Sequence, residues 1–125
     1  IMAAAVADYR PEVEAGQKIK KTSDDLVINL AKTTDILEAA QGNFVKVGFA
    51  AESQNLVENA KDKVKRKNLD LIVANDITEA DSGFGTDTNR VTLISRDLQV
   101  QELPLLTKYE VGNRILDRVR ELLNN

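Results

Sequence analysis

Three short, mainly apolar runs constrain the fold of this chain more than any other feature. They lie at residues 1–7 (IMAAAVA), 45–49 (VKVGF) and 71–75 (LIVAN). We interpret each run as a buried strand. The run at 71–75 is apolar at every position but the last, which is typical of a strand in a parallel sheet with helices packed over both faces.

Segments with helical character separate and follow these runs. Thr33 or Thr34 can cap a short helix that starts at Asp35, because a hydroxyl can accept a hydrogen bond from a free backbone amide of the first turn. Apolar residues at helical spacing predict a second helix that ends near Lys67, and residues 108–123 predict an amphipathic final helix.

The remaining segments predict an arm and two more strands. In residues 12–30, the sequences KIKK and LVINL flank a stretch with turn composition, which favours a β-hairpin arm with exposed faces. A polar loop at 77–88 precedes two strands at 90–95 and 100–103. The polar loop holds the sequence SGFG, which is a weak signal because it matches no nucleotide-binding fingerprint.

The order of these segments predicts an α/β fold. We expect a Rossmann-like, mostly parallel sheet with helices on both faces and a protruding β-arm, in a single domain over residues 1–125. A buried strand rarely begins a native chain. We therefore expect the sequence to be the carboxyl-terminal portion of a longer protein, with the domain incomplete at its amino terminus.

The absence of two residue types restricts the chemistry of any site. The 125 residues include no cysteine and no histidine, which excludes thiolate nucleophiles, disulfides, Cys–His zinc sites and a Ser-His-Asp triad. Chemistry must use carboxylates, lysines, backbone amides, a metal held by oxygens, or groups of the substrate. The net charge of −3 argues against a nucleic-acid partner, and the lack of cysteine fits a reducing compartment.

Polar or aromatic residues follow each predicted buried strand. Asp8 follows the first, Phe49 with Glu52 the second, and Asn75 with Asp76 the third. If the strands are parallel, these residues lie at one edge of the sheet, where open α/β sheets bind their ligands. The alternative is that polar residues end strands by default, and spacing alone does not decide between the two.

Two lysines at the end of the second helix favour a phosphate site. Lys63 and Lys67 are four residues apart, so they project from one face of a helix. The alternative is a solvated helix end, where cations complement the negative end of the macrodipole. The same dipole repels phosphate, so the lysines would have to overcome it.

The predicted arm is also basic. Lys18 lies in its first half, so closure of the arm as a flap would bring a cation to the phosphates of a ligand. The alternative is a solvated hairpin whose charges protect an edge strand from pairing with other chains.

Seven motifs in order resemble those of a known family, the bacterial phosphopantothenate–cysteine ligase. This ligase is usually the carboxyl-terminal half of a bifunctional flavoprotein of coenzyme A synthesis. The motifs are AAAVADYRP at 3–11, KIKK at 18–21, TDIL at 34–37, GFAAES at 48–53, KRKNLDLIVAND at 65–76, GFGTDTNRVTLI at 83–94 and LPLLTKYEVGNRIL at 103–116.

The resemblance implies a two-step reaction. CTP activates the carboxylate of 4′-phosphopantothenate as an acyl-cytidylate with release of pyrophosphate, and the amine of cysteine then displaces CMP. It implies Mg²⁺ as the companion of the triphosphate, with FMN confined to the fused decarboxylase half and absent from this chain. It also implies a cytoplasmic homodimer whose partners are these small molecules, with no nucleic acid and no membrane.

The resemblance also assigns residues to the nucleotide site. These nucleotide contacts are Asp8, Lys18, Thr34, Asp35, Ile36, Phe49, Lys63 and Lys67. Thr33 and Thr34 replace an Asn-Pro pair of the family, which removes any contact that depends on that asparagine side chain. No residue of the chain is expected as a metal ligand.

The catalytic residue is not assigned within this chain, because the asparagine associated with the acyl-cytidylate in the family lies upstream of Ile1. We therefore expect the 125-residue chain alone to lack ligase turnover. The alternative from a different class is a non-catalytic Rossmann-like nucleotide-binding module, or a module that pairs two subunits through the arm.

Overall fold

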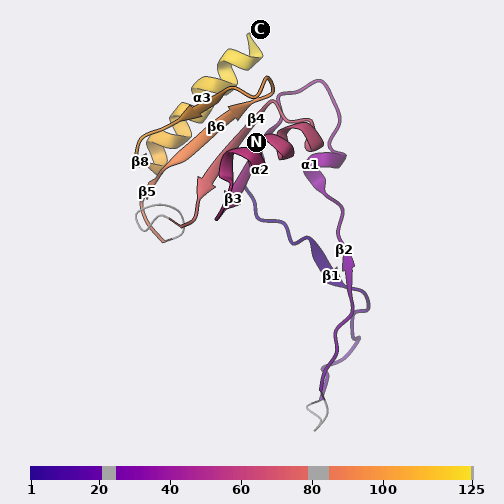
Figure 1. Cartoon of the computed structure of the whole chain (residues 1–125). Helices are drawn as coiled ribbons and strands as arrows, with labels where there is room; N and C mark the ends of the chain where they lie inside the picture. Colours follow the sequence, from indigo (N-terminus) through magenta and orange to yellow (C-terminus); the bar gives the residue numbers. More distant parts are fainter. Residues whose placement is uncertain (21–24, 79–84, 125) are drawn as a thin grey trace.

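A four-stranded sheet with the order β3-β4-β6-β7 forms the centre of the computed structural model, which describes residues 1–20, 25–78 and 85–124 (Figure 1). β3 and β4 are parallel, whereas the pairs β4/β6 and β6/β7 are antiparallel. The strands span Val47–Glu52 (β3), Leu71–Asp76 (β4), Val91–Ser95 (β6) and Val100–Glu102 (β7).

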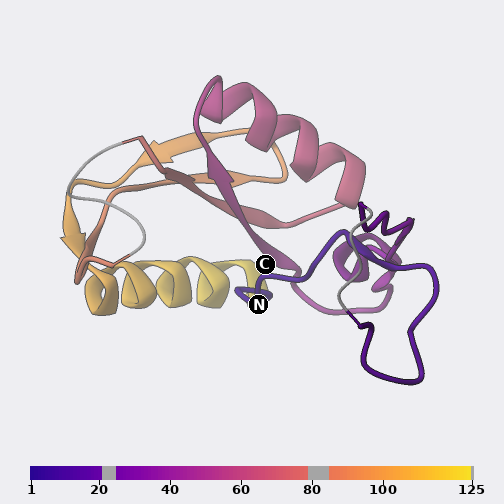
Figure 2. The same ribbon diagram turned by 90° about the horizontal axis from the view of Figure 1, so that it is seen from below.

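Helices cover both faces of this sheet, as predicted. α2 (Leu56–Lys67) lies on one face and α3 (Lys108–Leu123) on the other (Figure 2). Alternate residues of β4 face the two helices: Ile72 belongs to the cluster under α2, and Val73 belongs to the cluster under α3. The α/β fold with helices on both faces is therefore confirmed, and so is the doubly buried strand at 71–75.

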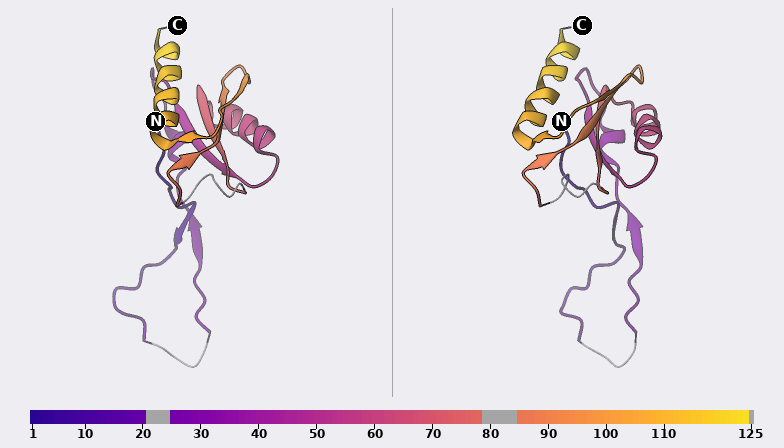
Figure 3. Two further views of the ribbon diagram at one scale, coloured as in Figure 1. Left: turned by 90° about the vertical axis from the view of Figure 1, so that its left-hand side faces the viewer. Right: turned by 60° about the vertical axis from the view of Figure 1, so that its left-hand side comes forward.

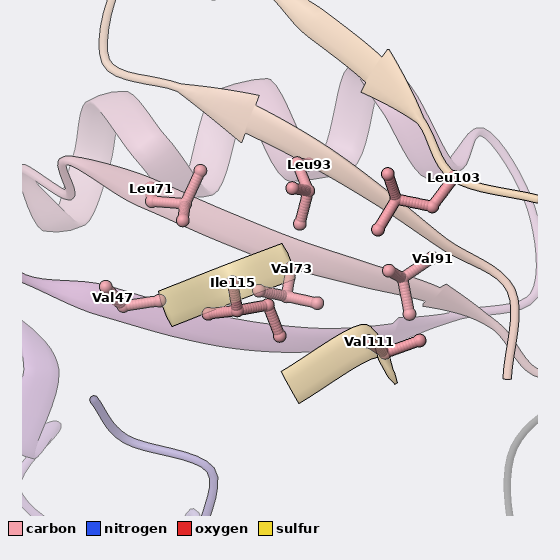
Figure 4. Close-up of a cluster of buried hydrophobic side chains, with 8 residues drawn as sticks. All are labelled: Val47, Leu71, Val73, Val91, Leu93, Leu103, Val111 and Ile115. Atoms are coloured by element: carbon pink, nitrogen blue, oxygen red, sulfur yellow. The ribbon is translucent and has the colours of Figure 1, made fainter. Parts of the chain in front are cut away.

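The larger cluster forms the core beneath α3. Its side chains converge from β3, β4 and β6 onto the apolar face of α3 (Figure 4). The buried members are Val47, Leu71, Val73, Val91, Leu93, Leu103, Val111 and Ile115.

The expectation of a mostly parallel sheet is wrong for the second half of the chain. Only the β3/β4 pair of this sheet is parallel among the described strands. Residues 96–99 alone connect β6 to β7. A connection this short joins antiparallel neighbours, because a parallel pair requires a crossover of a dozen or more residues.

The predicted first strand at 1–7 is also wrong. Met2 forms a single parallel bridge with Gly48, and its amide donates to the carbonyl of Val47 at 2.9 Å. Ile1 is 65% exposed and Val6 is 45% exposed. An apolar run becomes a buried strand only where other elements cover it, and no residue of 1–7 joins either core cluster.

The arm projects away from the sheet, and its strands lie at its base (Figures 1 and 3). β1 (Tyr9–Pro11) pairs antiparallel with β2 (Leu30–Lys32). The strands predicted at KIKK and LVINL are absent from residues 12–20 and 25–29, and residues 21–24, which hold the end of KIKK and most of the predicted turn, lie outside the described residues. A two-stranded ribbon without a covering layer gains little from burial, which explains why the pairing stops at the base.

A short helix and a small pair of strands are the remaining described elements. α1 (Ile36–Ala39) is capped by Asp35, which accepts from the amide of Glu38 at 3.1 Å, and not by Thr33 or Thr34 as predicted. A small antiparallel pair, β5 (Thr88–Asn89) with β8 (Leu106–Thr107), leads into α3. Within the ranges that the structure describes, no helix has the length and apolar character needed to cross a bilayer.

Candidate functional site

A hollow of about 220 Å³ lies between α1, β3, the end of α2 and the first residues of the chain. It is called the α1 hollow below. Six of the eight predicted nucleotide contacts line it, from segments far apart in sequence. Its lining consists of Met2, Ala4, Ala5, Val6, Asp8, Thr33, Thr34, Asp35, Ile36, Leu37, Phe49 and Lys67.

Hydrogen bonds between distant segments close one side of the hollow. The amide of Thr33 donates to the carbonyl of Asp8 at 2.9 Å, and the Thr33 hydroxyl donates to the carbonyl of Ala7. Residues 2–8 are thus held at one end by β3, through Met2, and at the other end by Thr33. This explains how an exposed apolar segment still forms a defined wall.

An ion pair places a cation at the hollow. Lys67 Nζ lies 2.7 Å from Asp35 Oδ2, and the two side chains are 19% and 35% exposed. The hydrogen bond from Lys67 lowers the pKa of the Asp35 carboxyl, and the amide of Glu38 acts in the same direction. Asp35 therefore stays ionised at neutral pH and holds the Lys67 ammonium beside the rest of the lining.

Lys63 does not share this hollow. One turn earlier on α2, its ammonium binds the carboxylate of Glu52, which also accepts from Asn59 Nδ2 at 3.1 Å. These three residues line a second, more open hollow of about 720 Å³. Lys18 lines neither hollow and lies on the arm.

The prediction that three strand ends share one edge of the sheet holds for two of them, β3 and β4, whereas residues 1–7 form no strand and Asp8 lines the α1 hollow. Glu52 of β3 is the register partner of Asp76 of β4. The side chains of β4, however, are engaged in the local fold. Asp76 accepts from the amide and hydroxyl of Thr78, which lowers the pKa of its carboxyl, and Asn75 Oδ1 accepts from Asn89 Nδ2 at 3.1 Å. These contacts give Asn75 and Asp76 a structural role.

One lysine near the site was not predicted from the sequence. Lys46 is only 7% exposed, and its ammonium donates to three backbone carbonyls. The acceptors are Leu37 at 3.0 Å and Ala40 at 2.8 Å, both at α1, and Lys67 at 3.1 Å, the last residue of α2. The sequence signal that could have identified Lys46 is a lysine inside an otherwise apolar run, because a buried ammonium needs acceptors for its N–H donors.

The acidic residues of the hollow do not form a metal cage. Across the described ranges, no group of three or more acidic, histidine or cysteine side chains is placed to hold a metal ion. The carboxylates of the hollow are Asp8 and Asp35, and Asp35 is already bound to Lys67. A magnesium ion at this place would therefore be held chiefly by oxygens of its ligand and by water.

Comparisons with known proteins agree on one family. Residues 1–123 match the family described as DNA/pantothenate metabolism flavoprotein C-terminal domain. A cysteine/cysteine sulfinic acid decarboxylase from an unknown prokaryotic organism is 41% identical over 128 residues, which cover 99% of this chain and 36% of that protein. The coenzyme A biosynthesis bifunctional protein CoaBC of Bacillus subtilis (strain 168) is 41% identical over 125 residues, which cover 98% and 31%.

A solved structure agrees with these relatives. The crystal structure of the C-terminal domain of a coenzyme A biosynthesis bifunctional protein CoaBC matches with a TM-score of 0.71 and 39% identity, over 97% of this chain and 52% of that one. The chain spans about a third of the length of the curated relatives that it matches.

Proposed function

The chain belongs to the DNA/pantothenate metabolism flavoprotein C-terminal domain family, and from this premise we propose that it forms the CTP-binding part of a phosphopantothenate–cysteine ligase. The reaction joins 4′-phosphopantothenate to cysteine. The carboxylate attacks the α-phosphorus of CTP and expels pyrophosphate, and the cysteine amine then attacks the acyl carbon and expels CMP. The CoaBC relatives support this assignment, because a solved CoaBC C-terminal domain matches nearly the whole chain.

The observation that carries the proposal is the convergence of Asp8, Asp35, Phe49 and Lys67 on one hollow. The first step requires neutralisation of phosphate charge more than a general base, because the attacking carboxylate is already ionised. The Lys67 ammonium supplies such a charge as a compact point donor. Thr34, Ile36 and the exposed face of Phe49 provide the remaining surface for the nucleotide.

Lys63 and Lys18 complete the proposed contacts from outside the hollow. Lys63 is on the same helix as Lys67, four residues earlier, and a triphosphate can extend from the α1 hollow toward it. Lys18 reaches the phosphates only if the arm closes as a flap. Mg²⁺ accompanies the triphosphate in this proposal, and FMN is assigned to the fused decarboxylase half.

A cytoplasmic homodimer formed by single domains of residues 1–125 is a further part of the proposal, and the arm supports its dimeric state. Apolar side chains along the arm are strongly exposed, with Val13 at 81% and Val27 at 80%. Burial of such side chains against a second copy would stabilise a dimer. Deletion of residues 12–25 is expected to lower the sedimentation coefficient to that of a monomer, and an unchanged dimer would contradict this role.

Calorimetric titration of CTP tests the nucleotide site. Loss of a charged hydrogen bond to phosphate predicts roughly tenfold to hundredfold weaker binding in Lys67→Ala. Arg120→Ala is the matched control, because Arg120 is an exposed cation on α3, far along the chain from the hollow. Equal CTP affinity in wild type and Lys67→Ala would refute the assignment of this hollow as the nucleotide site.

A chimera tests turnover separately from binding. This chain would replace the matching segment of the Bacillus subtilis relative, with and without Lys67→Ala, and formation of phosphopantothenoylcysteine would be measured. We expect product from the wild-type chimera and a large loss in the variant. CTP binding without turnover in the wild-type chimera would favour the non-catalytic nucleotide-binding module.

A further inference from the structure

Lys46 joins the two helices that flank the α1 hollow. Its side chain enters from β3's amino-terminal side, and its ammonium donates to carbonyls of Leu37, Ala40 and Lys67 at 2.8 to 3.1 Å. An ammonium has three N–H donors, so these contacts fill its capacity. The backbone of Lys46 is fixed as well, because its amide donates to Asp70 Oδ2 at 2.7 Å.

The position of this charge bears on phosphate binding. α2 ends at Lys67, and the last carbonyls of a helix carry a partial negative charge that disfavours an anion nearby. The Lys67 side chain lines the hollow from this unfavourable end. An ammonium bonded to the terminal carbonyl offsets that charge, and its burial protects it from screening by salt.

The same contacts fix the geometry of the ion pair in the hollow. The carbonyl bound by Lys46 belongs to the residue whose ammonium pairs with Asp35. The other two carbonyls belong to α1, whose first turn Asp35 caps. Lys46 therefore ties together the backbones that carry both members of the pair.

We propose that Lys46 is a positioning residue for anion binding, which holds Lys67 against α1 and offsets the negative end of α2, where a phosphate would approach. The proposal rests on the nucleotide site proposed above. Lys46 is not among the residues that line the hollow, and its ammonium donates to backbone carbonyls, so it acts through Lys67. A purely structural role would predict lower stability with no specific loss of phosphate affinity.

Two variants separate charge from hydrogen bonding. Lys46→Met keeps much of the length and removes both the charge and the donors, and Lys46→Gln keeps donors without the charge. We expect CTP to bind about tenfold more weakly to Lys46→Met, with Lys46→Gln also weakened. If Lys46→Met does not fold, the CTP affinity of Lys46→Gln tests the proposal.

A matched variant controls for lost stability. Val64→Ala removes a buried side chain of α2 that packs on the sheet, away from the hollow lining. It is expected to lose stability and to keep the CTP affinity of the wild type at a temperature where it is folded. If Val64→Ala weakens CTP binding as much as Lys46→Met, the positioning role is overturned.

A measurement without nucleotide distinguishes this inference from the proposed function. The titration of Asp35 can be followed by carboxyl ¹³C NMR in the free chain. Release of Lys67 in the Lys46 variants is expected to raise the pKa of Asp35 toward its ordinary value, and Val64→Ala is expected to leave it unchanged. If wild type fails to bind CTP, the nucleotide proposal fails and the Asp35 titration alone decides. Unchanged titration in both Lys46 variants would refute the inference.

Discussion

The core beneath α2 makes a sharp prediction at Ile94. This residue of β6 is fully buried and packs with Ala60 and Val64 of α2. Ile94→Ala removes three carbon atoms, worth about 2.4 kcal/mol of lost transfer free energy at 0.8 kcal/mol for each group. The cavity left behind raises the expected loss of unfolding free energy to about 3–4 kcal/mol.

Urea unfolding followed by circular dichroism measures this loss. We expect a lower midpoint with an unchanged m-value, since the change affects stability and not the surface exposed on unfolding. Leu116→Ala is the control: Leu116 is 56% exposed on α3, and its loss is expected to stay within about 0.5 kcal/mol. A loss below about 1 kcal/mol in Ile94→Ala would refute the buried position assigned to this side chain.

Four further substitutions test the sheet edge, the ion pair and the final helix. A Cβ at Gly48 would lie 3.0 Å from Leu69, so Gly48→Val is expected to cost about 1–3 kcal/mol in thermal melts. Gly112→Ala meets nothing within 4 Å and is expected to stabilise α3 by roughly 1 kcal/mol; equal effects of the two changes would contradict the packing. Folding lowers the pKa of Asp35 from its ordinary value of 3.8. The ionised carboxylate therefore stabilises the folded state above that ordinary pKa, and this stabilisation is lost as the pH falls through the lower pKa of the folded state. In Asp35→Asn, the free energy of unfolding measured with urea is therefore expected to fall less steeply at acid pH than in the wild type. An unchanged dependence on pH would count against the ion pair. Thr107→Ala removes the cap of α3 and is expected to cost about 1 kcal/mol in thermal unfolding, whereas an unchanged midpoint would show that the cap contributes nothing.

The sequence predicted well the elements whose signals are local. The helix expected at 108–123 is α3, and the strand expected at 71–75 is β4. In α3 the apolar spacing, the Thr107 cap and the helix itself lie within one continuous segment. Periodicity depends on near neighbours in the chain, so it can be read without knowledge of the fold.

Predictions that depended on residues far apart in the chain were less accurate. Residues 1–7 have the composition of a buried strand, yet they form one bridge at the edge of β3. The antiparallel direction of β6 and β7 followed from the short connection at residues 96–99, which the alternation of strand and helix signals alone did not take into account. Burial and pairing depend on what packs against a segment, which is a property of the whole chain.

The candidate site shows the same division. Spacing placed Lys63 and Lys67 on one face of a helix, and family resemblance assigned both to the nucleotide; that assignment stays a prediction. Only the tertiary structure separates them, with Lys63 bound to Glu52 and Lys67 bound to Asp35 at another hollow. Side chains four residues apart start close together but extend several ångströms, so the partners that each one finds decide where its charge lies.

Lys46 marks the limit of the sequence most clearly. As one letter in an apolar run, it carries no sign of which groups its charge will contact. The structure supplies them from the ends of two helices, 6 to 21 residues away in the chain. The sequence by itself determined the helix at 108–123, the strand at 71–75 and which charges are available. The tertiary structure alone decided which charges meet, because buried electrostatic contacts form between groups that only folding brings within hydrogen-bonding distance.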